Sequence, residues 1–520
     1  MWLEILEPPN LRTEIIGKRL FRNLLISLRA QRLVNMLFAI FTLLVGHAVC
    51  VVAESNIAAR QTSTQAFCSS SDLKYKLSKV DAPVFGSGTP GNSSTWSLSI
   101  DDTSEGHKQT VTGFGGSVTD ATVTVVNALP DDKRSQLLRE LLTSDGANFS
   151  LLRHTIASSD LSGPPAYTYD DSDGSADVDL DNFALGDRGT AMAEMLAEMK
   201  RIKLDLTIVG SSWSAPGWMK VNRVLTGNAD NNWLDSQYYE AYAQYFVHYL
   251  QKYAENGAII DAITIQNEPL NNQGNGHVTM YQSADEAAQV TRDHVGPALH
   301  EAGLQTEIWA YDHNTDEPSY PQTVIDAASE FVQATAWHCY ADNVDWSVLS
   351  DFKNKNPDKP QYMTECWTSP DTQWYQSSKN TVGPMQNWAQ GSMMWTLGTW
   401  TQASDGTFGP YISGGCSSCR GLFVVDKDAG TYEYTVDYYM LAQFSRFIPK
   451  GAIILNGTGS YSYEGYQGIQ SVASANPDGT RTVVIENTFG NDVYVTVDTK
   501  SGETWRGNII ANSVTTWILP

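Results

Sequence analysis

Residues 262–269 read Ala-Ile-Thr-Ile-Gln-Asn-Glu-Pro, and residues 361–367 read Gln-Tyr-Met-Thr-Glu-Cys-Trp. Each stretch is a short run of residues that favour strands, and each run ends near a glutamate, Glu268 or Glu365. This pattern is typical of a buried parallel strand that meets its following loop. Barrels of the α/β class place their chemistry at these strand ends. Because a desolvated carboxylate is costly unless it is paired, the two glutamates predict an acid/base pair.

Strand-like runs alternate with helical patterns between residues 108 and 445, which predicts βα units and a parallel sheet. Two helical segments stand out, 238–254 and 130–142, and the second has Pro and Asp at its start and Gly146 just past its end. Eight strand-like runs predict an α/β fold with a closed (β/α)8 TIM barrel over residues 108–445. The runs are 113–118, 150–156, 204–211, 259–266, 307–312, 334–338, 361–364 and 392–398.

The two ends of the chain have a different sequence pattern from that of residues 108–445. Beyond residue 445 the sequence alternates β-branched residues with turn signals, as in 482–486, 493–497 and 515–519. This is an antiparallel β pattern with no helix between the strands. Residues 54–107 also read as short strands with Gly, Ser and Pro turns. We predict that segments 54–107 and 446–520 pair into one small β-sandwich beside the barrel.

The first 53 residues predict a targeting segment. The basic residues Lys18, Arg19, Arg22, Arg29 and Arg32 precede an apolar stretch that begins at Met36 and runs on to Ala53. The pattern is typical of a secretory signal cleaved after Ala53, although the apolar stretch also approaches the ~20 residues of a membrane anchor. Met36 remains an alternative start. The sequence therefore predicts a secreted, extracellular glycoprotein with no stable membrane insertion after cleavage, with sequons at Asn92, Asn148 and Asn456.

The chain is strongly acidic, with a net charge of −24. Residues 1–53 hold six Lys/Arg and three Asp/Glu, so their removal takes away +3 and leaves −27. Such a charge argues against nucleic acid and anionic membrane surfaces as partners. It suits a secreted protein that meets neutral substrates.

Five cysteines remain beyond the leader, which is an odd number. Cys416-Ser-Ser-Cys419 has no second Cys or His pair nearby, so a local disulfide is expected rather than a metal site. Cys339 and Cys366 each follow a residue assigned to the pocket, so strand alternation turns them to the opposite face. They are expected to be buried packing thiols, with a bridge between adjacent strands as the alternative.

Glu268 and Glu365 project into one pocket if their runs are the fourth and seventh barrel strands. Such a pair cleaves glycosidic bonds, with one carboxyl as acid and the other as nucleophile. An ionised Glu365 is expected to keep Glu268 protonated near neutral pH. Asn267 is placed to hydrogen-bond a sugar hydroxyl, and Arg153 to hold a carboxylate ionised. The alternative is that both glutamates sit in ordinary surface loops.

Several other residue types point to sugar rather than to metal or phosphate. The histidines lack metal-ligand spacing, and His338 is expected to line the sugar site. Gly113-Phe-Gly-Gly116 is too short for a phosphate loop and lacks its lysine, so a tight strand-to-loop bend is expected. Indole rings stack on pyranose faces, and five tryptophans flank the predicted strand ends. They are Trp213, Trp218, Trp367, Trp395 and Trp400.

Seven motifs, in order, resemble glycoside hydrolase family 30 and, within it, the endo-β-1,6-glucanases secreted by filamentous fungi. The resemblance covers nearly all of residues 108–520. The motifs are Gly113-Phe-Gly-Gly-Ser-Val-Thr-Asp-Ala121, Arg153-His-Thr-Ile-Ala-Ser-Ser-Asp160, Tyr167-Thr-Tyr-Asp-Asp171, Trp213-Ser-Ala-Pro-Gly-Trp-Met-Lys220, Thr264-Ile-Gln-Asn-Glu-Pro269, Trp337-His-Cys-Tyr340 and Thr364-Glu-Cys-Trp367.

The resemblance implies a retaining hydrolase of internal β-1,6-glucosidic bonds, with Glu268 as acid/base and Glu365 as nucleophile. It implies no metal or organic cofactor, a β-1,6-glucan polysaccharide as substrate, and we expect a monomer. β-1,6-Galactan and glucosylceramide are alternative substrates, and a carbohydrate-binding protein on a decayed barrel is an alternative function. Residues implied on the non-reducing side of the cleaved bond are Arg153, Asp160, Trp213, Asn267, Tyr340 and Trp395.

Overall fold

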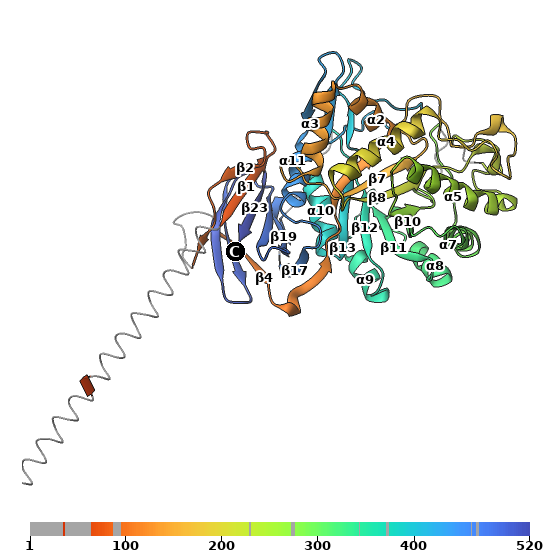
Figure 1. Ribbon diagram of the computed structural model, residues 1–520. Coiled ribbons are helices and arrows are strands. Elements are labelled where there is room, and N and C mark those ends of the chain that lie inside the picture. Colours follow the sequence, from red (N-terminus) through yellow and green to blue (C-terminus); the bar gives the residue numbers. More distant parts are fainter. Residues whose placement is uncertain are drawn as a thin grey trace, which may run out of the picture. The chain divides into compact units, whose positions relative to one another are not determined.

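Eight parallel strands close into a barrel in the computed structural model of the chain (Figure 1). The barrel strands are β6 (Gly113–Val118), β7 (Leu151–Ile156), β8 (Thr207–Ser212), β9 (Ala262–Thr264), β10 (Glu307–Asn314), β11 (Val332–His338), β12 (Gln361–Glu365) and β13 (Ala389–Met394). The predicted (β/α)8 barrel is therefore confirmed. The eighth run was misplaced, because its strand begins at Ala389 and residue Gly398 starts a separate strand, β14 (Gly398–Trp400).

The structure describes residues 35–36, 64–86, 95–227, 230–271, 276–342, 344–370, 374–458, 460–463 and 467–520. Apart from residues 35–36, the predicted leader and its cleavage site lie outside this set, as does the sequon at Asn92. Residues from Thr64 to Pro520 form one compact unit. Within the described residues, no helix has the length and apolar character needed to cross a membrane.

Helices connect the barrel strands and pack around them. Helix α3 follows the predicted pattern, with Pro130 at its N-cap and two aspartates in its first turn, where they complement the helix dipole. Helix α2 is capped by Thr119, whose side chain accepts a hydrogen bond from the Thr122 amide. The helices are α2 (Asp120–Asn127), α3 (Asp131–Leu142), α4 (Gly186–Ile202), α5 (Tyr239–Glu255), α6 (Ala284–Val290), α7 (Gly296–Glu301), α8 (Ser319–Ala328), α9 (Ser347–Lys355), α10 (Gln376–Gln386) and α11 (Val436–Ser445).

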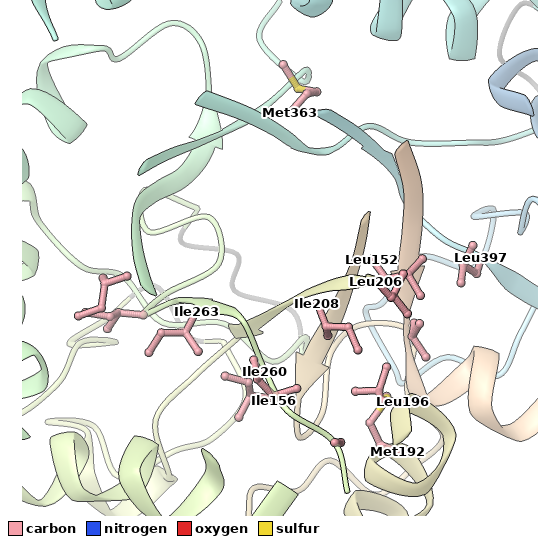
Figure 2. Close-up of a cluster of buried hydrophobic side chains, with 14 of the residues drawn as sticks. Leu152, Ile156, Met192, Leu196, Leu206, Ile208, Ile260, Ile263, Met363 and Leu397 are labelled. Atoms are coloured by element: carbon pink, nitrogen blue, oxygen red, sulfur yellow. The ribbon is translucent and has the colours of Figure 1, made fainter. Parts of the chain in front are cut away.

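The main core lies between the barrel strands and these helices. Figure 2 shows the strand residues Leu152 and Ile208 on the side of the barrel that Met192 and Leu196 of α4 cover, and Ile263 belongs to the same buried cluster. Burial of one such side chain contributes roughly 1.5–3 kcal/mol. The core therefore holds the strand ends, and with them the site, in fixed positions.

The glycine run near residue 113 lies inside β6 rather than in a bend. Gly115 and Gly116 pair with Met393 and Met394 of β13, so the run closes the barrel between its first and eighth strands. A Cβ on Gly115 would lie 2.1 Å from the Leu151 carbonyl oxygen of β7. The glycines are thus explained by close backbone approach, and the predicted bend was wrong.

A second sheet system contains strands from both ends of the described chain. Strand β1 pairs with β23, and β4 lies parallel to β21, so residues before the barrel and after it share one sandwich, as predicted. Trp505, Trp517 and Val495 are among its fully buried core residues. The strands are β1 (Gln65–Ser70), β2 (Ser78–Val80), β3 (Val84–Phe85), β4 (Thr95–Asp101), β5 (His107–Thr110), β17 (Ile453–Thr458), β18 (Ser460–Tyr463), β19 (Gln467–Ala475), β20 (Arg481–Asn487), β21 (Val493–Thr499), β22 (Thr504–Ile509) and β23 (Ser513–Leu519).

Helix α11 joins the sandwich to the barrel (Figure 1). Its buried Gln443 donates to Ser69 Oγ at 2.7 Å and accepts from Thr516 Oγ1 at 2.7 Å. The same helix contacts β6 of the barrel. A small sheet of β14, β15 (Phe423–Asp426) and β16 (Thr431–Tyr434) precedes it.

Candidate active site

Both glutamates reach one cavity at the carboxyl ends of the barrel strands. Glu365 is the last residue of β12, and Glu268 follows β9 by four residues. Glu268 has a φ of 45°, a backbone region that non-glycine residues seldom occupy and that recurs at functional sites. The cavity has a volume of about 620 Å³. Its lining includes Asp160, Glu268, Leu270, Asn271, His277, His313, Asn314, Tyr340, Glu365, Trp367, Trp395 and Cys416.

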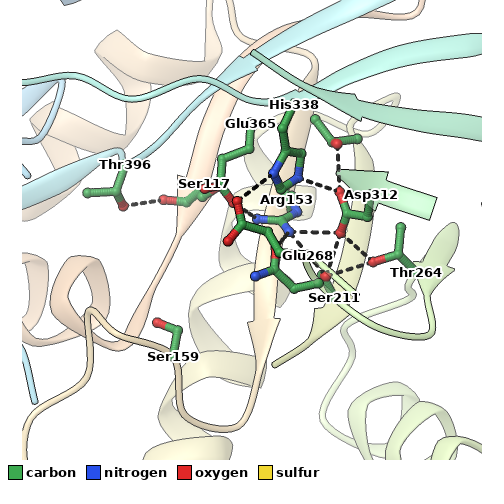
Figure 3. Close-up of polar contacts among 12 residues, drawn as sticks. Ser117, Arg153, Ser159, Ser211, Thr264, Glu268, Asp312, His338, Glu365 and Thr396 are labelled. Atoms are coloured by element: carbon green, nitrogen blue, oxygen red, sulfur yellow. Dashed lines mark hydrogen bonds and ion pairs between the residues drawn. The ribbon is translucent and has the colours of Figure 1, made fainter. Parts of the chain in front are cut away.

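Glu365 is held by two donors, Arg153 of β7 (Figure 3) and Tyr340 in the loop that follows β11. Arg153 of β7, which is fully buried, donates from Nη1 to Glu365 Oε2 at 2.7 Å. The Tyr340 hydroxyl donates to Glu365 Oε1 at 3.0 Å. Burial raises the pKa of Glu365 to about 6, while the charges of His338 and Arg153 work in the opposite direction. Glu365 is therefore an ionised, oriented carboxylate above pH 6.

Arg153 also fixes the residues around it. Its Nη2 donates to Asn267 Oδ1 at 2.6 Å and to Asp312 Oδ2 at 2.8 Å. Because the amide oxygen of Asn267 faces the guanidinium, the amide nitrogen points the other way. Asp312 is fully buried, and although burial raises its pKa, the charges of Arg153 and His338 outweigh that effect and hold the pKa well below its usual range.

Glu268 has a different set of neighbours. Asn271 Nδ2 donates to its Oε2 at 2.5 Å. Its Oε1 lies 3.3 Å from His338 Nδ1 and 3.7 Å from His313 Nδ1. His338 Nε2 in turn lies 2.9 Å from Asp312 Oδ1. The fully buried His338 thus bridges Asp312 and Glu268 beneath the cavity (Figure 3).

The expectation that an ionised Glu365 keeps Glu268 protonated near neutral pH is wrong. Burial raises the pKa of Glu268, but the neighbouring imidazoles of His313 and His338 outweigh it and hold the pKa well below its usual range. Burial lowers the pKa of His338, but Glu365 and Asp312 outweigh it and raise the pKa to about 9. The proton therefore rests on His338, one hydrogen bond away from Glu268.

Two tryptophans form an aromatic wall beside these carboxylates. Trp213 and Trp395 stack with ring centroids 5.1 Å apart, and the Arg153 guanidinium lies 4.8 Å from the Trp213 centroid. Trp395 lines the cavity, and Trp213 supports it from behind. Trp218 instead donates to the Asp170 carbonyl in the core, and Trp400 lies in β14.

The Cys416–Cys419 disulfide, as expected, closes a loop on the cavity wall. Asp160 lies against this loop, and its backbone carbonyl accepts a hydrogen bond from the Ile412 amide at 3.1 Å. Burial raises the pKa of the Asp160 side-chain carboxyl to about 7. Cys339 and Cys366 also form a disulfide, so the expectation of two packing thiols was wrong. The ends of β11 and β12 are adjacent in the barrel, which brings the two cysteines together.

The sequence reasoning missed Asp312, Asn271 and His277. Asp312 was taken only as the end of the fifth strand, although a buried aspartate at a barrel strand end is a signal of its own. Asn271 follows Glu268 by three residues and could have been found by helical-turn spacing. His277 comes from a loop with no regular pattern, so the sequence held no signal for it.

Two family models match this chain. The glycosyl hydrolase family 30 TIM-barrel domain matches residues 111–448, and the family 30 beta sandwich domain matches residues 453–517. The chain belongs to glycosyl hydrolase family 30. Family 30 membership agrees with the resemblance read from the seven motifs.

Family 30 relatives extend the comparison. The chain is 58% identical to the endo-1,6-beta-D-glucanase neg1 of Aspergillus fumigatus over 89% of this chain and 95% of that protein. It is 55% identical to an endo-1,6-beta-D-glucanase of Neurospora crassa over 91% of this chain and 98% of that protein. The solved endo-beta1,6-glucanase BT3312 superposes with a TM-score of 0.75 at 26% identity, over 88% of this chain and 99% of that one.

Proposed function

We propose that this family 30 chain is a retaining endo-β-1,6-glucanase that cleaves internal bonds of β-1,6-glucan by double displacement. The nucleophile and the acid/base are assigned from the different surroundings of the two glutamates. Glu365 is oriented by Arg153 and Tyr340, whereas Glu268 faces the protonated His338. The relatives named above support the linkage and the endo action.

Glu365 is the nucleophile. Its carboxylate attacks C1 of the sugar as the bond from C1 to O6 of the leaving glucose breaks, which forms a glucosyl ester on Glu365. Arg153 and Tyr340 keep the carboxylate ionised and aimed. Asn267, with its oxygen facing Arg153, donates from its amide nitrogen to the sugar 2-hydroxyl.

Glu268 is the acid and then the base. It receives a proton from His338 through their 3.3 Å contact and passes it to the leaving O6. In the second step the Glu268 carboxylate takes a proton from water as that water attacks C1 and releases Glu365. Two inversions give retention at C1.

Azide separates the two roles. In Glu365→Ala, azide takes the place of the nucleophile, so we expect rescued turnover to give α-glucosyl azide. In Glu268→Ala, azide attacks the glucosyl ester, so β-glucosyl azide is expected. Each variant without azide should lose roughly 10²–10⁴-fold or more in kcat. A Glu433→Ala variant on an exposed strand is the control. The reverse pattern of azide anomers would exchange the roles.

Product analysis tests the substrate. Linear β-1,6-glucan, β-1,6-galactan and glucosylceramide are incubated with the protein, and Glu365→Gln serves as the blank. We expect oligosaccharides of several lengths from the glucan alone, because an endo enzyme cuts inside the chain. Glucose as the first product would indicate exo action, and turnover of another substrate would change the specificity. Binding without any turnover would favour a carbohydrate-binding protein.

We also propose that the protein is a secreted monomer. The basic residues and the apolar stretch before Ala53 support secretion, and the acidic mature sequence suits a neutral polysaccharide. Expression in a fungal host with N-terminal sequencing of the medium protein tests this, and Glu54 is the expected first residue. Retention of the chain in the membrane fraction would contradict it. Light scattering of the purified protein reports its oligomeric state.

A further inference from the structure

The surroundings of Glu268 contain more nitrogen donors than acid/base catalysis needs. Oε1 of Glu268 and the Nδ1 atoms of His313 and His338 all lie within 4.8 Å of one another. Glu268 Oε1 is 3.3 Å from His338 Nδ1 and 3.7 Å from His313 Nδ1. Two ligands of one tetrahedral zinc, each bonded at about 2.0–2.1 Å, lie about 3.3–3.4 Å apart. The two distances from Glu268 Oε1 are therefore close to the spacing of zinc ligands, and the two histidine nitrogens lie within 4.8 Å of each other.

The histidines are presented as ligands. Asp312 Oδ1 lies 2.9 Å from His338 Nε2, so Nε2 carries a hydrogen and Nδ1 offers its lone pair once the second proton has left. Asp312 is itself held by the Thr264 and Thr364 hydroxyls at 2.6 Å each. This is the carboxylate–histidine arrangement that orients metal-bound imidazoles. His313 Nδ1 is buried and has no hydrogen-bond partner among the described residues.

The charge and the shape of the site also suit a divalent cation. Glu268, Glu365 and Asp312 are three carboxylates against the single guanidinium of Arg153. With a neutral His338 the cluster therefore carries a net charge of −2. Glu268 and His313 line the cavity, so water from the cavity can take the fourth position of a tetrahedral ion.

We propose that Glu268, His313 and His338 form a reversible inhibitory site for Zn²⁺ and chemically similar ions such as Cu²⁺ and Co²⁺. A bound ion takes the Glu268 lone pair and the His338 nitrogen, so Glu268 can no longer receive the proton that it gives to the leaving oxygen. The ion also occupies the space of that oxygen. Inhibition is therefore competitive with glucan and reversed by a chelator. The inhibition rests on the proposed function, whereas the binding of metal does not.

Metal binding is measured first, on protein prepared without a histidine tag. Co²⁺ is added to Glu365→Gln, which keeps all three ligands and lacks turnover. We expect visible absorption typical of tetrahedral Co²⁺, displaced by Zn²⁺ in stoichiometric amount. His313→Ala should weaken Zn²⁺ binding by at least about 10-fold, because loss of a residue that only supports a metal ligand already lowers metal affinity by about 10–100-fold. His300→Ala, an exposed histidine on α7, is the matched control and should bind as wild type.

Inhibition is measured next, as the Zn²⁺ dependence of glucan hydrolysis by wild type and by His313→Ala. We expect Zn²⁺ to raise KM without lowering kcat, and the inhibition constant to rise by at least about 10-fold in the variant. Absence of the tetrahedral Co²⁺ spectrum, or equal Zn²⁺ affinity in His313→Ala and His300→Ala, would overturn the metal site. Tight Zn²⁺ binding together with inactive wild-type enzyme would instead overturn the proposed function and leave the metal site standing.

Discussion

His338 is the residue on which both limbs of the pH profile depend. Its positive charge lowers the pKa of Glu365, which burial and the neighbouring carboxylates raise to about 6. It also keeps the pKa of Glu268 low and itself releases its proton only near a pKa of about 9. The active form therefore has Glu365 ionised and His338 protonated. Activity of the wild type should fall below about pH 6 and again towards pH 9.

Substitution of His338 by Asn removes that charge. The pKa of Glu365 should then rise, so the acidic limb of kcat/KM moves to higher pH. The basic limb should move to lower pH, because the proton must now be held by Glu268 itself. We expect kcat/KM to stay high over a narrower range of pH. We also expect kcat to fall by about 10²-fold or more, since one proton donor is lost. A uniform loss of activity with unchanged limbs would mean that His338 only supports the fold. His300→Asn is the control.

Strand β6 shows how an element is fixed by its glycines. A Cβ on Gly115 would meet the Leu151 carbonyl oxygen at 2.1 Å and Leu152 Cδ2 at 3.0 Å. Gly115→Ala must therefore push β6 away from β7, and we expect a loss of about 1–3 kcal/mol in the free energy of unfolding. Gly490→Ala is the control, because no atom lies within 4 Å of its added Cβ. Its effect should stay within about 0.5 kcal/mol in urea unfolding. Equal stability of the two variants would contradict this account of β6.

The elements were predictable to different degrees, for physical reasons. Barrel strands such as β7 and β12 are short runs of strand-forming residues that are buried at every position, and the helical patterns between them mark their places in the chain. The end of the eighth run was misread, because the apolar residues continue through Leu397 to β14, which pairs outside the barrel. The Gly113–Gly116 run was read by local conformational freedom, whereas contact with a neighbouring strand explains it.

The site was predictable in its residues and not in its electrostatics. Glu268 and Glu365 follow from strand ends, since parallel strands all deliver their last residues to one face. Arg153 lies third in β7 and reaches Glu365 through its long side chain. The proton could not be placed on His338 from the sequence, because that depends on Asp312 two strands away from Glu365. Similarly, the Cys339–Cys366 disulfide depends on the register of β11 against β12.

At the scale of the whole molecule, buried carboxyls set the pH range of stability. Burial raises the pKa of Asp160, Asp170, Glu286 and Glu486 to about 7 each. A raised carboxyl pKa means that the folded state holds a proton which the unfolded chain has already released. This contribution is complete below the ordinary pKa values of 3.8 for Asp and 4.5 for Glu and is lost as the pH rises through about 7. Asp312 acts in the opposite sense: its lowered pKa stabilises the fold above pH 3.8, and that contribution is lost as the pH falls further.

The melting temperature should therefore be higher at pH 5 than at pH 8. Glu486, which is 1% exposed and accepts a hydrogen bond from Ser378, offers the sharpest test. Glu486→Gln keeps a neutral group of the same shape, so it should remove part of the difference between the two pH values and be more stable than wild type at pH 8. Exposed Glu433→Gln also removes one charge from the acidic chain and serves as the control for general repulsion. If both variants reduced the pH dependence equally, net charge and not the buried carboxyls would govern it.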